Sequence, residues 1–162
     1  MFTELLERNK MFTFVDLLER TRLVEYDSPN HLYRVSWKNK GAVLREEPHL
    51  PPKDVTAGQE DEVTPRVSMA PSVHQAIAAA APPYDEQKKE YSEGKEWYVY
   101  QLTSKPKLHV PSRDEVSDSY ISGEIWALEP VVMELVMKVR ITKAIYTEVY
   151  DQSDYTVIED YR

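Results

Sequence analysis

One stretch in the last third of the chain alternates between apolar and polar residues with little interruption. Charged side chains at Glu134, Lys138 and Arg140 share one side of the alternation. The apolar side consists of Val131, Met133, Leu135, Met137, Val139 and Ile141. A period of two with β-branched residues is typical of a strand that buries one face. The pattern therefore predicts a half-buried strand over residues 131–141.

A second stretch joins a short strand to a helix. Residues 67–70 favour a strand, and Pro71 ends it because proline cannot donate to a ladder. Ser72 and Gln75 stand at capping-box spacing, and a run of alanines follows, so a helix is predicted over residues 72–81. Two prolines then end the helix. Such a corner either faces a ligand or is an ordinary strand-to-helix connection.

The remaining elements are shorter. The first 22 residues contain a near-repeat of the motif MFT…LLER and predict a helical amino-terminal extension, as a packing helix or a loose leader. The polar, proline-rich segment 41–65 predicts a long loop, either a lid or a plain excursion. A short helical turn is expected at 112–115. Further strands are expected at 31–37, 96–102, 108–111, 124–128, 145–150 and 155–158. Together they predict one α+β domain over residues 1–162, mostly antiparallel, with one main helix.

Composition narrows the classes of function. The chain of 162 residues has a net charge of -8, no cysteine, four glycines and four scattered histidines. These numbers argue against a nucleic-acid partner, a thiol nucleophile, a glycine-rich phosphate loop and a metal site. No apolar run approaches the roughly 20 residues that span a membrane. Charged residues interrupt the first segment, so no signal peptide is expected. We therefore expect a cytoplasmic protein without a membrane segment.

Three residues form the best candidate for chemistry. Arg34 lies on the first predicted strand, and an arginine can hold a phosphate or carboxylate in a planar fork. Ser68 lies just before the capped helix, where a hydroxyl can orient a polar ligand. Glu124 opens a late strand after Gly123, and a carboxylate there could stabilise positive charge developing at an anomeric carbon.

Arginine, serine and glutamate, in this order on three strands, resemble the signature of ADP-ribosyltransferases. The motifs are LYRVS around Arg34, RVSMAPS around Ser68 and SGEIW around Glu124. The same segments are similar to small phage and bacterial proteins. The resemblance implies that Arg34, Ser68 and the adjacent Tyr33 bind NAD and that Glu124 is the catalytic carboxylate. Arginine-modifying members have Ser-Thr-Ser where this chain has residues 68–70, and a second glutamate where it has Ser122, so the acceptor stays open.

Three hypotheses follow for the function. The first is an ADP-ribosyltransferase-like enzyme that uses NAD as its substrate, in a bacterial host cell if a phage encodes it. The alternative is a non-catalytic inhibitor of the phage type that binds a protein partner through its acidic surface. The third is a structural or assembly component, for which the tyrosine-rich chain and its edge-like terminal strands would suit a homodimer formed through the sheet. Trp37, Trp97 and Trp126 could stack on a nicotinamide or adenine ring or could belong to the core.

Overall fold

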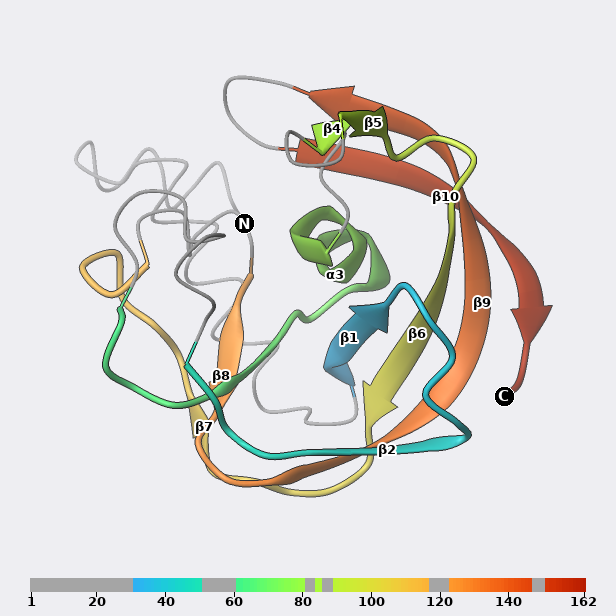
Figure 1. The fold of residues 1–162 in the computed structure, drawn as a ribbon. Helices are drawn as coiled ribbons and strands as arrows, with labels where there is room; N and C mark the ends of the chain where they lie inside the picture. The colour runs from blue at the N-terminus through green and yellow to red at the C-terminus, as the bar shows by residue number, and fades with distance from the viewer. Residues whose placement is uncertain (1–30, 51–60, 81–83, 86–88, 117–122, 147–150) are drawn as a thin grey trace, which may run out of the picture.

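The structure is a computed structural model, and it describes residues 31–50, 61–80, 84–85, 89–116, 123–146 and 151–162. Its centre is a five-stranded antiparallel sheet that curves around the short helix α3 (Val73–Ala80), as Figure 1 shows. The sheet consists of β1 (Tyr33–Ser36), β2 (Val43–Glu46), β6 (Glu96–Leu102), β9 (Val131–Tyr146) and β10 (Asp151–Asp160).

Strand β9 organises this sheet because it is long enough to pair with three others. Met133 pairs with Leu102 of β6 and with Leu44 of β2, so β6 and β2 flank β9 on opposite sides. Further along, Val139 pairs with β6 and with β10. β2 and β10 therefore follow one another along one side of β9, while β6 and then β1 extend the other side.

A smaller sheet carries the second part of the fold. It has the order β3-β8-β7, with all pairs antiparallel, and contains β3 (Val67–Met69), β7 (Leu108–His109) and β8 (Ile125–Ala127). A pair of backbone hydrogen bonds between Tyr33 and Ala70, 2.8 and 2.9 Å long, joins it to the long sheet. A similar bridge joins His49 to Arg66. A separate two-stranded ladder pairs β4 (Tyr84–Asp85) with β5 (Glu90–Tyr91).

The helix α3 (Val73–Ala80) begins as the sequence predicts, one residue after Ser72. The Ser72 hydroxyl accepts a hydrogen bond from the backbone N–H of Gln75 at 3.2 Å and donates to Oε1 of the same residue at 2.8 Å. The helix buries Val73, Ala76 and Ile77 and packs against β1 and β10. The cap fixes the direction in which the chain leaves β3.

The core divides into two clusters, and β9 contributes to both. One cluster fills the space between the two sheets and includes Tyr100 and Met133, and the other lies beneath α3 and includes Ile77 and Val139. The β6–β9 pairing shifts register where Val99 faces Met137 and Tyr100 faces Leu135, which leaves Val136 as the extra residue of a bulge. The bulge therefore lies where β9 passes from one cluster to the other.

The structure confirms a mostly antiparallel α+β fold, with one short helix among the residues that it describes. The predicted amino-terminal helix over residues 1–22 lies outside the described residues. The prediction of a continuous loop over 41–65 was wrong, because β2 lies within it and pairs with β9. A sequence this polar still forms a strand there because β9 offers an open edge and Leu44 enters the core. The short strands β4 and β5, between α3 and β6, were not predicted either.

Tyr100 offers a test of the packing in this sheet. Its side chain is fully buried, and its hydroxyl accepts from the backbone N–H of Lys40 and donates to the carbonyl of Gly41, both at 2.9 Å. Tyr100→Phe leaves both backbone groups without this partner, so the free energy of unfolding should fall by about 1–3 kcal/mol in urea denaturation. The matched change Tyr91→Phe, at an exposed position, should shift it by less than about 0.5 kcal/mol. Equal effects of the two changes would contradict the role given to the Tyr100 hydroxyl.

Candidate functional site

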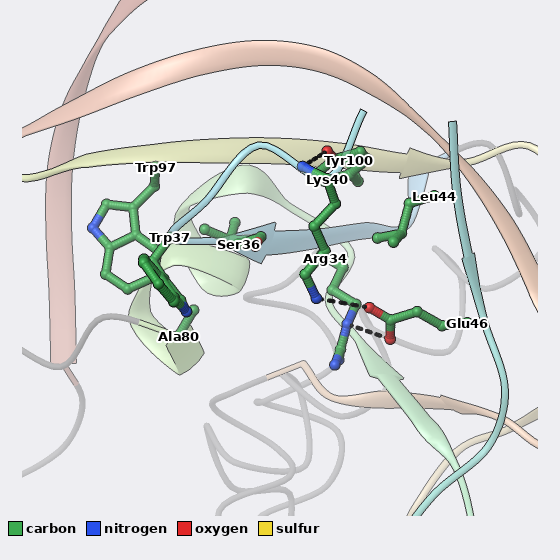
Figure 2. A pocket seen from close by; sticks show the side chains of 10 residues that line it. Arg34, Ser36, Trp37, Lys40, Leu44, Glu46, Ala80, Trp97 and Tyr100 are labelled. Atoms are coloured by element: carbon green, nitrogen blue, oxygen red, sulfur yellow. Dashed lines mark hydrogen bonds and ion pairs between the residues drawn. The ribbon is translucent and has the colours of Figure 1, made fainter. Parts of the chain in front are cut away.

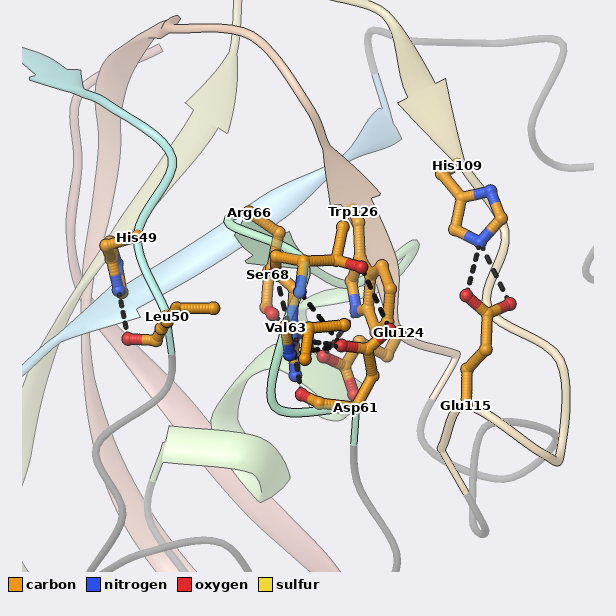
Figure 3. A network of polar contacts seen from close by, with 11 residues as sticks. His49, Leu50, Asp61, Val63, Arg66, Ser68, His109, Glu115, Glu124 and Trp126 are labelled. Carbon is orange, nitrogen blue, oxygen red and sulfur yellow. Dashed lines mark hydrogen bonds and ion pairs between the residues drawn. The ribbon is translucent and has the colours of Figure 1, made fainter.

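Arg34, Ser68 and Glu124 come together where the two sheets meet, from segments far apart in the sequence. The hydroxyl of Ser68 donates a hydrogen bond of 2.8 Å to Oε1 of Glu124 (Figure 3). Antiparallel pairing of β3 with β8 explains this contact, because Ser68 pairs with Trp126, two residues beyond Glu124. The Trp126 indole N–H also donates to Glu124 Oε1, at 2.8 Å. Two donors on one oxygen fix the orientation of the carboxylate.

Arg34 connects the Ser68–Glu124 pair to the long sheet. Its Nη1 donates a hydrogen bond of 2.8 Å to the backbone carbonyl of Ser68. Its Nε lies 3.0 Å from Oε2 of Glu46, a residue of β2 (Figure 2). The Arg34 side chain keeps 27% of its surface exposed, so part of the guanidinium faces solvent. The guanidinium therefore stands between Glu46 on one side and the Ser68–Glu124 pair on the other.

Trp126 is itself held from both sides. It is fully buried, with the guanidinium carbon of Arg66 4.1 Å from its ring centroid and the ring of His109 at 5.4 Å. Arg66 is 2% exposed and donates to the carbonyls of Asp61 and Thr64 at 2.7 and 3.1 Å. A buried arginine that makes such bonds is a structural cation. Arg66 thus supports the indole that orients Glu124.

The short loop before β3 depends on Asp61. Its Oδ1 accepts from the backbone N–H groups of Val63 and Thr64 at 2.7 and 2.9 Å, and its Oδ2 accepts from the Thr64 hydroxyl at 2.9 Å. The Val63 hydrogen bond, followed by those of Thr64 and the charge of Arg66, lowers the pKa of Asp61 below 3.8. The loop thereby offers Arg66 two carbonyls in a fixed geometry.

A second carboxylate anchors the turn beyond β7. Both oxygens of Glu115 lie within hydrogen-bond distance of His109 Nε2, at 2.9 and 3.0 Å. Oε1 also accepts from the backbone N–H of Ser112 at 3.0 Å, as the predicted helical turn at 112–115 requires. The Ser112 bond first, and then the bond to His109, lower the pKa of Glu115. This turn fixes the histidine ring that packs on Trp126.

Gly123 meets a strict backbone requirement directly before Glu124. Its φ is +68°, and a Cβ added there would lie 2.5 Å from Gln75 Nε2 and 2.8 Å from Pro71 Cδ. Only glycine fits a left-handed conformation this close to other atoms. Gly123 therefore lets the chain pass the start of α3 and places Glu124 beside Ser68.

A pocket of about 290 Å³ lies beside Arg34, and neither Ser68 nor Glu124 lines it. Its two ends differ in chemistry, as Figure 2 shows. One end has Trp37, Trp97 and Ala80, and the other has charged groups. The charged end consists of Arg34, Lys40 and Glu46.

The other candidate residues, Tyr33 and the three tryptophans, lie in or near the core or at the surface. The side chain of Tyr33 packs against the core cluster beneath α3, while its backbone bridges the sheets. Trp126 belongs to the core, Trp97 packs against it, and Trp37 is 67% exposed. Glu46 was missed, because it lies in the segment predicted to be a loop. The run Val43-Leu44 after a glycine was the sequence signal for a strand there.

Comparisons with protein families, curated proteins and solved structures give no match for this chain. Within the part of the chain that the structure describes, no three acidic or histidine side chains gather as metal ligands would, and no helix is long and apolar enough to cross a membrane. The chemistry of the site must therefore be argued from its own geometry.

Gly123→Ala tests whether the chain needs glycine at this position to pass Gln75 and Pro71. The change should lower the free energy of unfolding by about 1–2 kcal/mol for the left-handed backbone and by a further 1–3 kcal/mol or so for the clash with Gln75 and Pro71. Gly94→Ala is the matched control, because Gly94 has a φ of +82° with no atom within 4 Å of an added Cβ. It should show only the backbone cost in thermal or urea unfolding. Equal losses for both variants would contradict the close contact at Gly123.

Asp61→Ala tests the loop that supports Trp126. The free energy of unfolding should fall by about 1–3 kcal/mol at pH 7, since the variant leaves two backbone N–H groups without their acceptor. The folded-state pKa of Asp61 is lowered from 3.8, so its contribution is fully present above that pH and is lost as the pH falls through the folded value. In urea unfolding from pH 7 down to about pH 3, the difference in the free energy of unfolding between the variant and wild type should become smaller. The exposed control Asp114→Ala should show no comparable gap, and a gap that widens toward acid would contradict the assignment.

Proposed function

We propose that this protein is ADP-ribosyltransferase-like, binding NAD at the junction of the two sheets and transferring ADP-ribose to water or to an acceptor. One observation carries the proposal: the Ser68 hydroxyl hydrogen-bonds Glu124, and Arg34 holds the backbone of the same serine. A common site of the kind that the resemblance implies requires these three residues to lie close together in the fold. Residues 34, 68 and 124 are far apart in the chain, so their order alone could not bring them together.

The proposed chemistry begins with cleavage of the bond between the ribose anomeric carbon and the nicotinamide nitrogen. The electron pair of that bond returns to the pyridinium ring, which leaves as neutral nicotinamide. Positive charge develops on the ribosyl group, as in other oxocarbenium-like transition states. An attacking water or acceptor then forms the new bond to the anomeric carbon and releases its proton to solvent.

Each of the three residues has a separate task in this proposal. Glu124 is the catalytic residue, and its carboxylate stabilises the developing positive charge because its orientation is fixed before the substrate arrives. Ser68 positions the carboxylate and the nicotinamide ribose. Arg34, which is partly exposed, holds the phosphates with donors of its guanidinium fork.

Glu124→Gln is the direct test. Glutamine keeps an oxygen that can accept from Ser68 and Trp126, so the fold should be retained while the negative charge is lost. Release of nicotinamide from NAD, measured by chromatography, should fall by about 10²–10³-fold, a loss typical of removing one fixed electrostatic group. Transfer to protein should be followed with labelled NAD in bacterial lysate.

Glu134→Gln is the control, because Glu134 is exposed on β9 and should leave the rate unchanged. Full activity in Glu124→Gln would contradict the proposed role of the carboxylate. Wild-type protein that neither binds nor cleaves NAD would overturn the function and favour the alternative of a non-catalytic interaction protein. In that case binding to a partner should weaken with added salt.

A further inference from the structure

The chain from the end of β1 to the middle of β2 exposes only positive charge. This basic segment (residues 37–45) contains three charged side chains, those of Lys38, Lys40 and Arg45, and all three residues are exposed. Among the residues that the structure describes, Lys38 and Arg45 have no carboxylate within ion-pair distance. In a chain whose net charge is -8, such a cluster is a local site of attraction for anionic groups.

Side-chain hydrogen bonds fix the backbone of the basic segment. The Tyr100 hydroxyl accepts from the backbone N–H of Lys40 and donates to the carbonyl of Gly41, both at 2.9 Å. The backbone N–H of Gly41 in turn donates to Oδ1 of Asn39 at 2.8 Å. Because the turn is already ordered, a partner that docks on it costs little conformational entropy in this segment.

Trp37 adds an apolar anchor beside these cations. It is 67% exposed, and Nζ of Lys38 lies 5.5 Å from its ring centroid. Trp37 and Lys40 line the pocket of about 290 Å³ (Figure 2). Lys40 and Arg45 line a second, more open pocket that adjoins the first. An exposed tryptophan beside an arginine is typical of the residues that contribute most to binding at protein interfaces.

We propose that the basic segment binds an acidic segment of a partner protein. An aromatic or aliphatic side chain of the partner packs on Trp37, and carboxylates on either side of it form ion pairs with Lys38 and Arg45. This interaction goes beyond the proposed function, because it uses neither Ser68 nor Glu124 and does not depend on cleavage of NAD.

The surroundings of the basic segment favour a short acidic segment over a nucleic acid. A nucleic-acid site presents cations along the length of a phosphate backbone. Here Glu46 lies 3.6 Å from Nζ of Lys40, and the exposed Glu47 follows two residues after Arg45. These carboxylates, and the net charge of -8, would repel a long polyanion. A short segment can meet the cations without approaching the rest of the surface.

The test is calorimetric titration of the full chain with a synthetic peptide in which glutamates flank one phenylalanine. Wild type should bind it with a Kd below about 1 mM, and added salt should weaken binding. Arg45→Glu should weaken binding at least about tenfold, because it replaces an attraction with a repulsion. Lys143→Glu is the matched control and should keep wild-type affinity. Lys143 is exposed and lies in the part of β9 that pairs with β10, whereas Arg45 pairs with the other end.

Tryptophan fluorescence locates the bound peptide. Trp126 is fully buried and Trp97 is partly buried, so acrylamide should quench mainly the emission of Trp37. The peptide should protect this emission from quenching. A peptide with alanine in place of phenylalanine should bind more weakly and protect it less, because it lacks the side chain that packs on the indole.

The proposal is overturned if the glutamate–phenylalanine peptide does not bind at millimolar concentration, or if Arg45→Glu and Lys143→Glu weaken its binding equally. Tighter binding of an oligothymidylate than of the peptide would also overturn it and would indicate a nucleic-acid surface. If Arg45→Glu does not fold, Lys38→Glu repeats the test in the turn before β2. Glu124→Gln should bind the peptide as wild type does, which separates this result from any outcome for NAD cleavage.

Discussion

Two backbone hydrogen bonds between Tyr33 and Ala70 hold the candidate site together, because they are where the two sheets meet. They bring β1 beside the end of β3, so that Arg34 can reach the Ser68 carbonyl. Pro71 follows at once and ends the strand, and the cap at Ser72 then turns the chain into α3. The predicted corner between strand and helix thus fixes the positions of Arg34 and Ser68 relative to each other.

The two inner arginines show how one side-chain chemistry serves two purposes. Arg66 is almost fully buried, packs on Trp126 and donates to two carbonyls. The Arg66 guanidinium makes these contacts inside the fold, where it supports the indole that orients Glu124. Arg34 is partly exposed and faces Glu46 in a pocket. An arginine with solvent access beside a pocket is the one able to meet an anionic ligand.

Local patterns predicted the elements whose physics is local. The alternation over 131–141, the strand over 96–102 and the capped helix after Ser72 all appear in the structure. The strand β2 was missed, since its formation depends on the open edge of β9 rather than on its own composition. The bulge at Val136 was not predicted either. The alternation of apolar and polar residues does not distinguish the part of β9 in one core cluster from the part in the other.

The candidate site was predictable only as a set of residues. The order of Arg34, Ser68 and Glu124 came from the resemblance to a family, whereas their hydrogen bonds depend on the pairing of β1, β3 and β8. No spacing in the sequence connects Glu46 to Arg34, because their contact arises only when β2 and β1 lie in the same sheet. Long-range register is the information that a pattern along one chain does not contain.

The proposed NAD site at the junction of the two sheets depends on Arg34. Calorimetric titration of NAD into wild type and into Arg34→Ala tests it most directly, with thermal unfolding of both proteins to show that each is folded. Wild type should bind NAD with a Kd below about 1 mM, and the variant should bind at least about tenfold more weakly, the scale of one charge-assisted hydrogen bond. Equal binding by the two proteins, or no binding by wild type at millimolar NAD, would contradict it.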